Sequence, residues 1–208
     1  MHGLVNRSIQ CFLRDTYGPG CWAAVARAAG VGPGGFETML HYDDALTGAM
    51  LDAAAGQLRR PREAVLEDLG IYLISHPGPE FLRRLLRFGG VGFADFLHSL
   101  EDLPERGRLA VPDLDLPELK LAEQAGPGRY DLICRGGPPG IGHVVAGMLR
   151  AMADDYGALA LVDHAGATAG EERISIHLLD SRFAAGRPFD LAAGPDPARG
   201  STPEGARG

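Results

Sequence analysis

The chain has 208 residues, 45% of them hydrophobic, and a formal net charge of -7. This length allows one domain with a sizeable core. The negative charge, without a dense run of Lys or Arg, argues against nucleic acid or an anionic membrane surface as a partner. Three cysteines without CxxC spacing suggest neither a disulfide framework nor a zinc site. No apolar run reaches the roughly 18 residues that a membrane span needs, so we expect a cytoplasmic protein.

The first part of the chain is predicted to be mainly helical. Apolar residues recur at helical spacing from residue 4 to about residue 89, with short breaks at 18–19, 30–35, 60–61 and 76–79. Adjacent acids at Asp43 and Asp44 precede one of these helices. We expect them to cap it, since a carboxylate there accepts from free backbone N–H groups.

A further amphipathic segment runs from about residue 92 to residue 103. Its apolar stripe consists of Phe93, Phe96, Leu97, Leu100 and Leu103. We expect this helix to end at Pro104, because proline restricts the preceding residue and cannot donate a backbone hydrogen bond.

The period then changes from helix to strand. Residues 130–135 alternate between apolar and polar side chains, which predicts a strand. A long helix with an apolar face follows over about 141–156. Two more strands are predicted around 159–162 and 174–179, on either side of a glycine-rich turn at 166–170. Helices followed by strands indicate an α+β domain. We assign it to residues 1–185, followed by an extension over 186–208 that is too poor in apolar residues to order from about residue 194.

Several motifs in this order resemble the heme-nitric-oxide/oxygen-binding (H-NOX) family. They are Met1-His2-Gly3-Leu4-Val5-Asn6-Arg7, Tyr17-Gly18 followed by Trp22, Tyr42-Asp43-Asp44, and Ala153-Asp154-Asp155-Tyr156-Gly157. The resemblance implies a helical N-terminal half packed on an antiparallel sheet, with a long helix in the C-terminal half. It also implies a sensor domain without enzymatic activity and with heme as cofactor.

Two signatures of the family's heme site are altered. In family members, a histidine at the end of the amphipathic helix ligates the iron, and here that position falls on Pro104, which has no side-chain donor. A Tyr-x-Ser-x-Arg strand motif holds the heme propionates. Tyr130 and Arg135 correspond to its ends, but their odd separation places them on opposite faces of a regular strand unless a bulge restores the register.

Other positions match the family's pocket. Val5, Val144 and Met148 resemble its distal wall, and Pro117 matches the proline that packs on the tetrapyrrole. Apolar residues are equally expected in an ordinary core.

A displaced histidine is the remaining source of an iron ligand. His143 opens the helix of the distal wall, and His98 lies on the same helix as position 104, about 120° from the usual ligand direction. For both residues an ordinary polar role is the alternative.

Two functions are therefore open. The first is a stand-alone heme sensor of nitric oxide or another diatomic gas, which signals through a separate histidine kinase or cyclic-dinucleotide enzyme. The second is a heme-free H-NOX-like module, which binds another apolar ligand or acts only by protein–protein contact. Loss of the histidine and disruption of the propionate motif favour the second.

Overall fold

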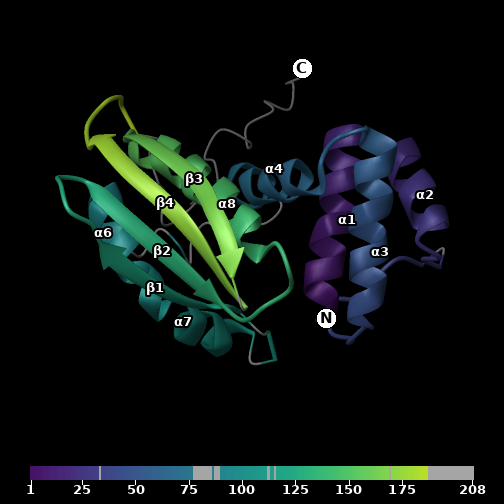
Figure 1. Ribbon diagram of the computed structural model, residues 1–208. Coiled ribbons are helices and arrows are strands. Elements are labelled where there is room, and N and C mark those ends of the chain that lie inside the picture. Colours follow the sequence, from purple (N-terminus) through teal and green to yellow (C-terminus); the bar gives the residue numbers. More distant parts are fainter. Residues whose placement is uncertain are drawn as a thin grey trace, which may run out of the picture.

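The computed structural model describes residues 1–32, 34–76, 86, 90–111, 113–114, 116–168 and 170–186. Two groups of elements are visible in Figure 1, a set of N-terminal helices and a sheet backed by further helices. The predicted extension lies outside the described residues from 187 onward. Residues 181–186 fold back on the domain, since Ala184 donates a backbone hydrogen bond to Gly157 O at 3.0 Å.

The N-terminal half is helical, as its periodicity predicts. Its helices are α1 (Gly3–Tyr17), α2 (Pro19–Ala28), α3 (Asp44–Leu58) and α4 (Arg62–Ser75). Their apolar faces meet in one core cluster that includes Phe12, Leu13 and Met50. Asp43 caps α3 as expected, because its carboxylate accepts from Ala45 N at 2.9 Å.

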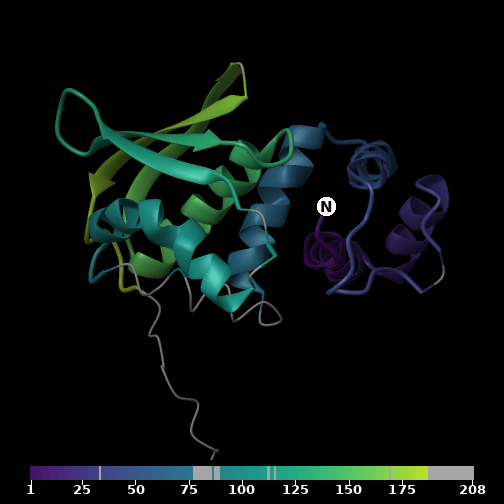
Figure 2. The ribbon, with the colours of Figure 1, turned by 90° about the horizontal axis from the view of Figure 1, so that it is seen from below.

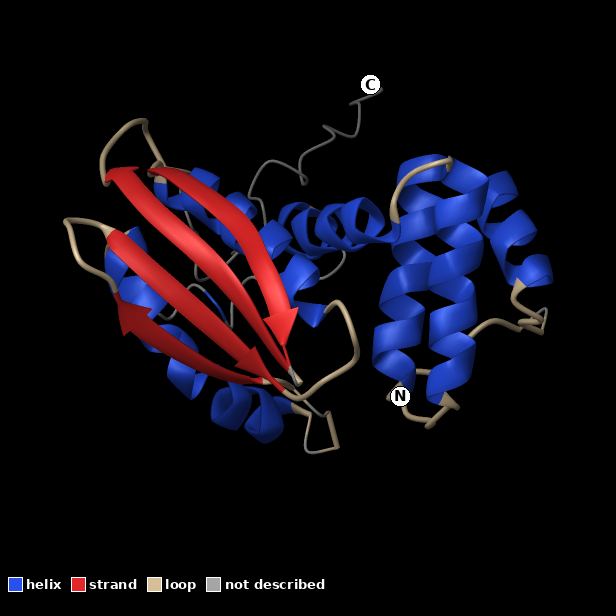
Figure 3. Ribbon diagram, in the orientation of Figure 1, coloured by secondary structure: helices blue, strands red, loops and turns tan. Residues whose placement is uncertain are grey.

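The C-terminal half is built on a four-stranded antiparallel sheet with the order β1-β2-β4-β3. Its strands are β1 (Glu118–Glu123), β2 (Arg129–Arg135), β3 (Leu159–Thr168) and β4 (Glu171–Asp180). The long helix α8 (Ile141–Tyr156) and the short helices that precede β1 lie against one face of the sheet (Figures 2 and 3). The α+β prediction is confirmed. The last two strands are longer than predicted, and β3 continues through Gly166 with a register shift.

The segment around Pro104 differs from the prediction. It forms α6 (Phe93–His98), a 3-10 turn (Ser99–Asp102) and α7 (Leu103–Ala110). Pro104 is therefore the second residue of a helix and does not end one, and His98 does not lie on the same α-helix as position 104 as predicted. Proline is tolerated in the first turn of a helix, where its missing N–H would have no intrahelical partner. The predicted apolar stripe is confirmed, since all five of its residues are buried. They belong to a second core cluster, the sheet-side core, which also includes Leu132, Met152 and Ile174.

Helices α4 and α8 join the two halves at very close range. A Cβ atom added to Gly147 of α8 would collide with the backbone O of Glu67 on α4, and one added to Gly70 of α4 would collide with the backbone O of Val144. The two backbones therefore touch without intervening side chains. Among the described residues, no helix is long and apolar enough to cross a membrane.

Candidate functional site

The position at which the resemblance predicts the family's iron ligand is occupied by a buried proline. Pro104 is the second residue of α7 and is shielded from solvent, next to the buried Leu103. Its ring carries no lone pair for a metal, since its nitrogen belongs to the backbone amide. Position 104 therefore lies inside the protein and offers no side-chain donor for a metal.

Strand β2 places Tyr130 and Arg135 on opposite faces of the sheet. Its pairing with β4 runs in regular register from Arg129 to Arg135, so no bulge brings the two side chains together. Tyr130 packs against the sheet-side core, whereas the exposed Arg135 pairs through Nε with Glu171 Oε1 at 2.7 Å. Pro104 and the separated pair of Tyr130 and Arg135 therefore do not match the heme contacts that the resemblance predicts. Whether Tyr130 or Arg135 contacts a cofactor stays a prediction.

The apolar residues expected at the pocket wall lie close to the junction of the two halves. Val144 is buried against the helical cluster, Val5 packs on that same cluster, and Met148 contacts both core clusters. Pro117 is buried, with Gly137 of the loop after β2 beside it. The fold therefore brings Val5, Val144 and Met148 to one region, and their contact with a ligand stays a prediction.

His98, the first substitute ligand, lies on the surface. Its side chain is 53% exposed, its Nε2 lies 3.5 Å from Glu123 Oε1, and its ring meets the ring of Tyr130 edge-on. These contacts match the alternative role of a solvent-facing polar residue.

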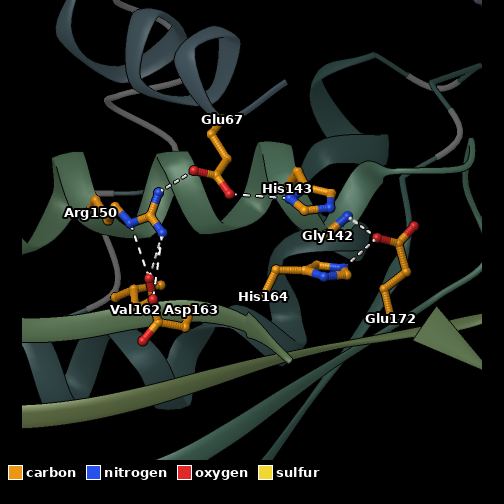
Figure 4. Close-up of polar contacts among 8 residues, drawn as sticks. All are labelled: Glu67, Gly142, His143, Arg150, Val162, Asp163, His164 and Glu172. Atoms are coloured by element: carbon orange, nitrogen blue, oxygen red, sulfur yellow. Dashed lines mark hydrogen bonds and ion pairs between the residues drawn. The ribbon is translucent and has the colours of Figure 1, made fainter. Parts of the chain in front are cut away.

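His143, the second substitute ligand, belongs to a polar network at the start of α8 (Figure 4). Its Nδ1 lies 3.2 Å from Glu67 Oε1, and its ring stacks on His164 with centroids 3.9 Å apart. On α8 its direction differs by about 100° from that of Val144 and by about 140° from that of Met148. To ligate an iron beside those residues, the ring would have to leave both partners.

The network continues from His143 on both sides. Arg150 of α8 donates to Glu67 Oε2 at 2.6 Å and, through Nε and Nη2, to Val162 O of β3 at 3.0 and 2.7 Å. His164 of β3 lies 3.0 Å from Glu172 Oε2, and Glu172 of β4 also accepts from the backbone N–H groups of Gly140 and Gly142. Glu172 therefore satisfies donors at the N-terminus of α8.

The carboxyl group of Glu67 is held in its charged form. Burial raises the pKa of Glu67, but the hydrogen bonds from Arg150 and His143 more than offset this effect and lower the pKa below its ordinary value. Because the pKa is lowered, the charged group stabilises the fold at pH values above the ordinary pKa of a carboxyl group. This stabilisation is lost as the pH falls through the lowered pKa of the folded chain.

We predict that Glu67→Gln lowers the free energy of unfolding by about 1 kcal/mol at pH 7, because a neutral amide binds Arg150 more weakly than a carboxylate does. The difference should be smaller near pH 3, because the carboxyl group of Glu67 loses its charge as the pH falls toward and through its lowered pKa in the folded chain. Urea unfolding at the two pH values measures it. Glu63→Gln, on the exposed side of α4, is the matched control. An equal loss at both pH values would contradict the electrostatic explanation.

Sequence reasoning missed most of this network. Glu67, Arg150 and Glu172 come from three separate elements, and nothing in the sequence around His164 singles it out. No local spacing signals such a cluster, since Glu67 and Arg150 are 83 residues apart. In the described part of the chain, no group of three or more His, Cys, Asp or Glu residues has the geometry to hold a metal ion.

The helical half and the antiparallel sheet, with α8 between them, form the fold of H-NOX domains, a class of sensor domain. The model of the Haem-NO-binding (HNOB) family matches residues 2–163, and this chain belongs to that family. A triple mutant of the H-NOX protein from S. oneidensis in the Fe(II) state superimposes with a TM-score of 0.74 at 14% identity, covering 88% of this chain and 98% of that one. The unliganded Fe(II) H-NOX protein from K. algicida gives 0.68 at 14% identity, covering 87% and 98%.

Curated relatives are longer proteins. Soluble guanylate cyclase gcy-31 of Caenorhabditis elegans is 24% identical over 150 residues, which are 72% of this chain and 21% of that protein. Soluble guanylate cyclase 89Db of Drosophila melanogaster is 21% identical over 183 residues, which are 84% and 27% of the two chains. This chain therefore spans about a quarter or less of their length.

Proposed function

We propose that this chain is a regulatory module of the HNOB family that controls a signalling enzyme and does so without a histidine–iron bond from position 104. The observation that carries the proposal is the buried Pro104 at the start of α7, at the position where the resemblance predicts the family's iron ligand. A second, independent change supports it, since Tyr130 and Arg135 face opposite sides of β2. The module itself is proposed to be non-enzymatic.

The partner is proposed from the relatives. In the two guanylate cyclases, the matched region is a minor part of a longer protein named for a catalytic activity. We propose that this module regulates a signalling enzyme. The candidates are a histidine kinase, a nucleotide cyclase and a cyclic-dinucleotide enzyme. Regulation of this kind requires two shapes of the module with different affinity for the ligand or the partner.

The experiment is an absorbance spectrum of the full chain, expressed with ample heme and purified. We expect a folded, colourless protein, because no imidazole is placed to hold iron at position 104. Circular dichroism verifies the fold.

The competing outcome is a heme sensor with a displaced ligand. A Soret band that persists through purification and disappears in His143→Ala or His98→Ala would overturn the heme-free proposal. Such a protein would then be tested for binding of nitric oxide and other diatomic gases.

A further inference from the structure

The loop that leads into α3 presents two apolar side chains to solvent. Met39 is 76% exposed and Leu40 is 49% exposed, at a turn in which Leu40 N donates to Glu37 O at 3.3 Å. The turn lies beside the first residues of α1 (Figure 3). Exposed apolar residues are common on protein surfaces, so exposure alone indicates no site. This turn is distinguished by the way in which it is held and by the charge around it.

Backbone contacts fix the turn to the start of α1. Gly3 N donates to Leu40 O at 2.7 Å, and Tyr42 N donates to Met1 O at 2.9 Å. A Cβ atom added to Gly3 would collide with Glu37 O, so a glycine lets the turn approach α1 this closely. Glu37 N also donates to Tyr42 Oη at 2.9 Å, which ties the two ends of the turn together.

Buried polar side chains of the N-terminal segment hold the same loop. Gln10 Oε1 accepts from Phe36 N at 3.3 Å, and the His2 ring meets the His41 ring edge-on with centroids 5.1 Å apart. His2 and Gln10 are 6% and 7% exposed, and Phe36 is buried in the helical core cluster. The turn is therefore positioned before any partner arrives, and it would lose little backbone freedom on binding one.

The part of the chain around the turn is acidic. Residues 28–58 contain no Lys or Arg but four acidic residues. Glu37 and Asp43 are exposed on either side of the apolar pair in the sequence, and Asp44, whose side chain is 81% exposed, pairs with the N-terminal ammonium group. Such charge disfavours an anionic lipid surface and favours a basic protein surface.

We propose that residues 37–43 form a docking site for a protein partner that presents an apolar surface rimmed by Lys and Arg side chains. Met39 and Leu40 pack on the apolar surface, and Glu37 and Asp43 meet its basic rim. Methionine suits this role because its unbranched side chain adapts to surfaces of different shape. Opposite charge speeds the encounter and discriminates against acidic surfaces. The inference does not rest on the proposed function, since neither α7 nor β2 contributes to this site.

An NMR titration of the full chain with a synthetic peptide tests the docking site. The probe is an amphipathic helix of Leu and Lys, whose apolar stripe has a basic border, and a helix of Leu and Glu is its matched counterpart. Methyl-labelled methionine reports binding, because Met39 is exposed whereas Met50 and Met152 are buried. We expect the Leu/Lys helix to shift the Met39 methyl signal and the Leu/Glu helix to leave it in place. Unchanged Met50 and Met152 signals verify the fold.

Two variants separate this site from general attraction of a basic peptide to an acidic protein. Leu40→Ser removes an apolar contact and Glu37→Lys reverses a charge, while both keep the Met39 reporter. Each should weaken binding of the Leu/Lys helix by at least about fivefold. Leu109→Ser is the matched control, since Leu109 is 88% exposed on α7, and it should bind the helix as the native chain does.

The outcomes decide between a docking site and an ordinary exposed turn. A Met39 signal that does not respond to the Leu/Lys helix, or equal binding by the native chain, Leu40→Ser and Glu37→Lys, would overturn the inference. A Met39 signal that shifts when the chain alone is concentrated would also overturn it and would indicate a second copy of the chain as the occupant. A Soret band in the native protein would overturn the heme-free proposal and leave this test unaffected.

Discussion

Gly147→Ala should destabilise the protein by about 2 kcal/mol. The added methyl group would meet the backbone carbonyl of Glu67 on α4, and neither helix backbone can move aside as a flexible side chain could. Overpacking of this kind costs about 3 kcal/mol, and the better helix propensity of alanine returns about 1 kcal/mol. For a chain of this size, the melting temperature should fall by about 4–8 °C in a thermal unfolding experiment.

A matched glycine on another helix provides the control. Gly48 lies within α3 and a Cβ atom there would have no neighbour within 4 Å. Gly48→Ala should therefore stabilise the protein by about 0.5–1 kcal/mol through helix propensity alone. If Gly147→Ala stabilised the protein as Gly48→Ala should, the close contact between α4 and α8 would not be a property of the folded protein in solution.

Pro104→His should give the protein a measurable affinity for heme. The substitution supplies a neutral imidazole at the family's ligand position, which is buried at the start of α7. We expect the heme retained after purification to rise by at least about tenfold, which corresponds to ~1.4 kcal/mol of binding free energy. The Soret absorbance relative to the protein absorbance measures this ratio. Retention should stay weaker than in family members, because Arg135 is engaged with Glu171.

The control Pro104→Ala separates the effect of the imidazole donor on heme retention from the effect of removing the proline ring. Alanine frees the backbone in the same way but offers no lone pair, so this variant should stay as colourless as the native chain. Equal heme retention in Pro104→His and Pro104→Ala would show that position 104 does not face a heme pocket. It would favour a module that works only through other apolar ligands or through its surface.

Local sequence patterns were sufficient for most of the secondary structure. Helical spacing predicted the N-terminal helices, alternation predicted β2, and the stripe from Phe93 to Leu103 is buried as expected. Pro104 was the exception in this region. A proline can end one helix or stand in the first turn of the next, and here Pro104 is the second residue of α7.

The sequence by itself determined the family, the proline at position 104 and the odd separation of Tyr130 and Arg135, because these are properties of residue identity and order. The tertiary structure alone decided that β2 has no bulge, that α4 and α8 touch at Gly70 and Gly147, and that His143 stacks on His164. Such contacts join residues far apart in the chain. They depend on the packing of whole helices and strands, which no local spacing encodes.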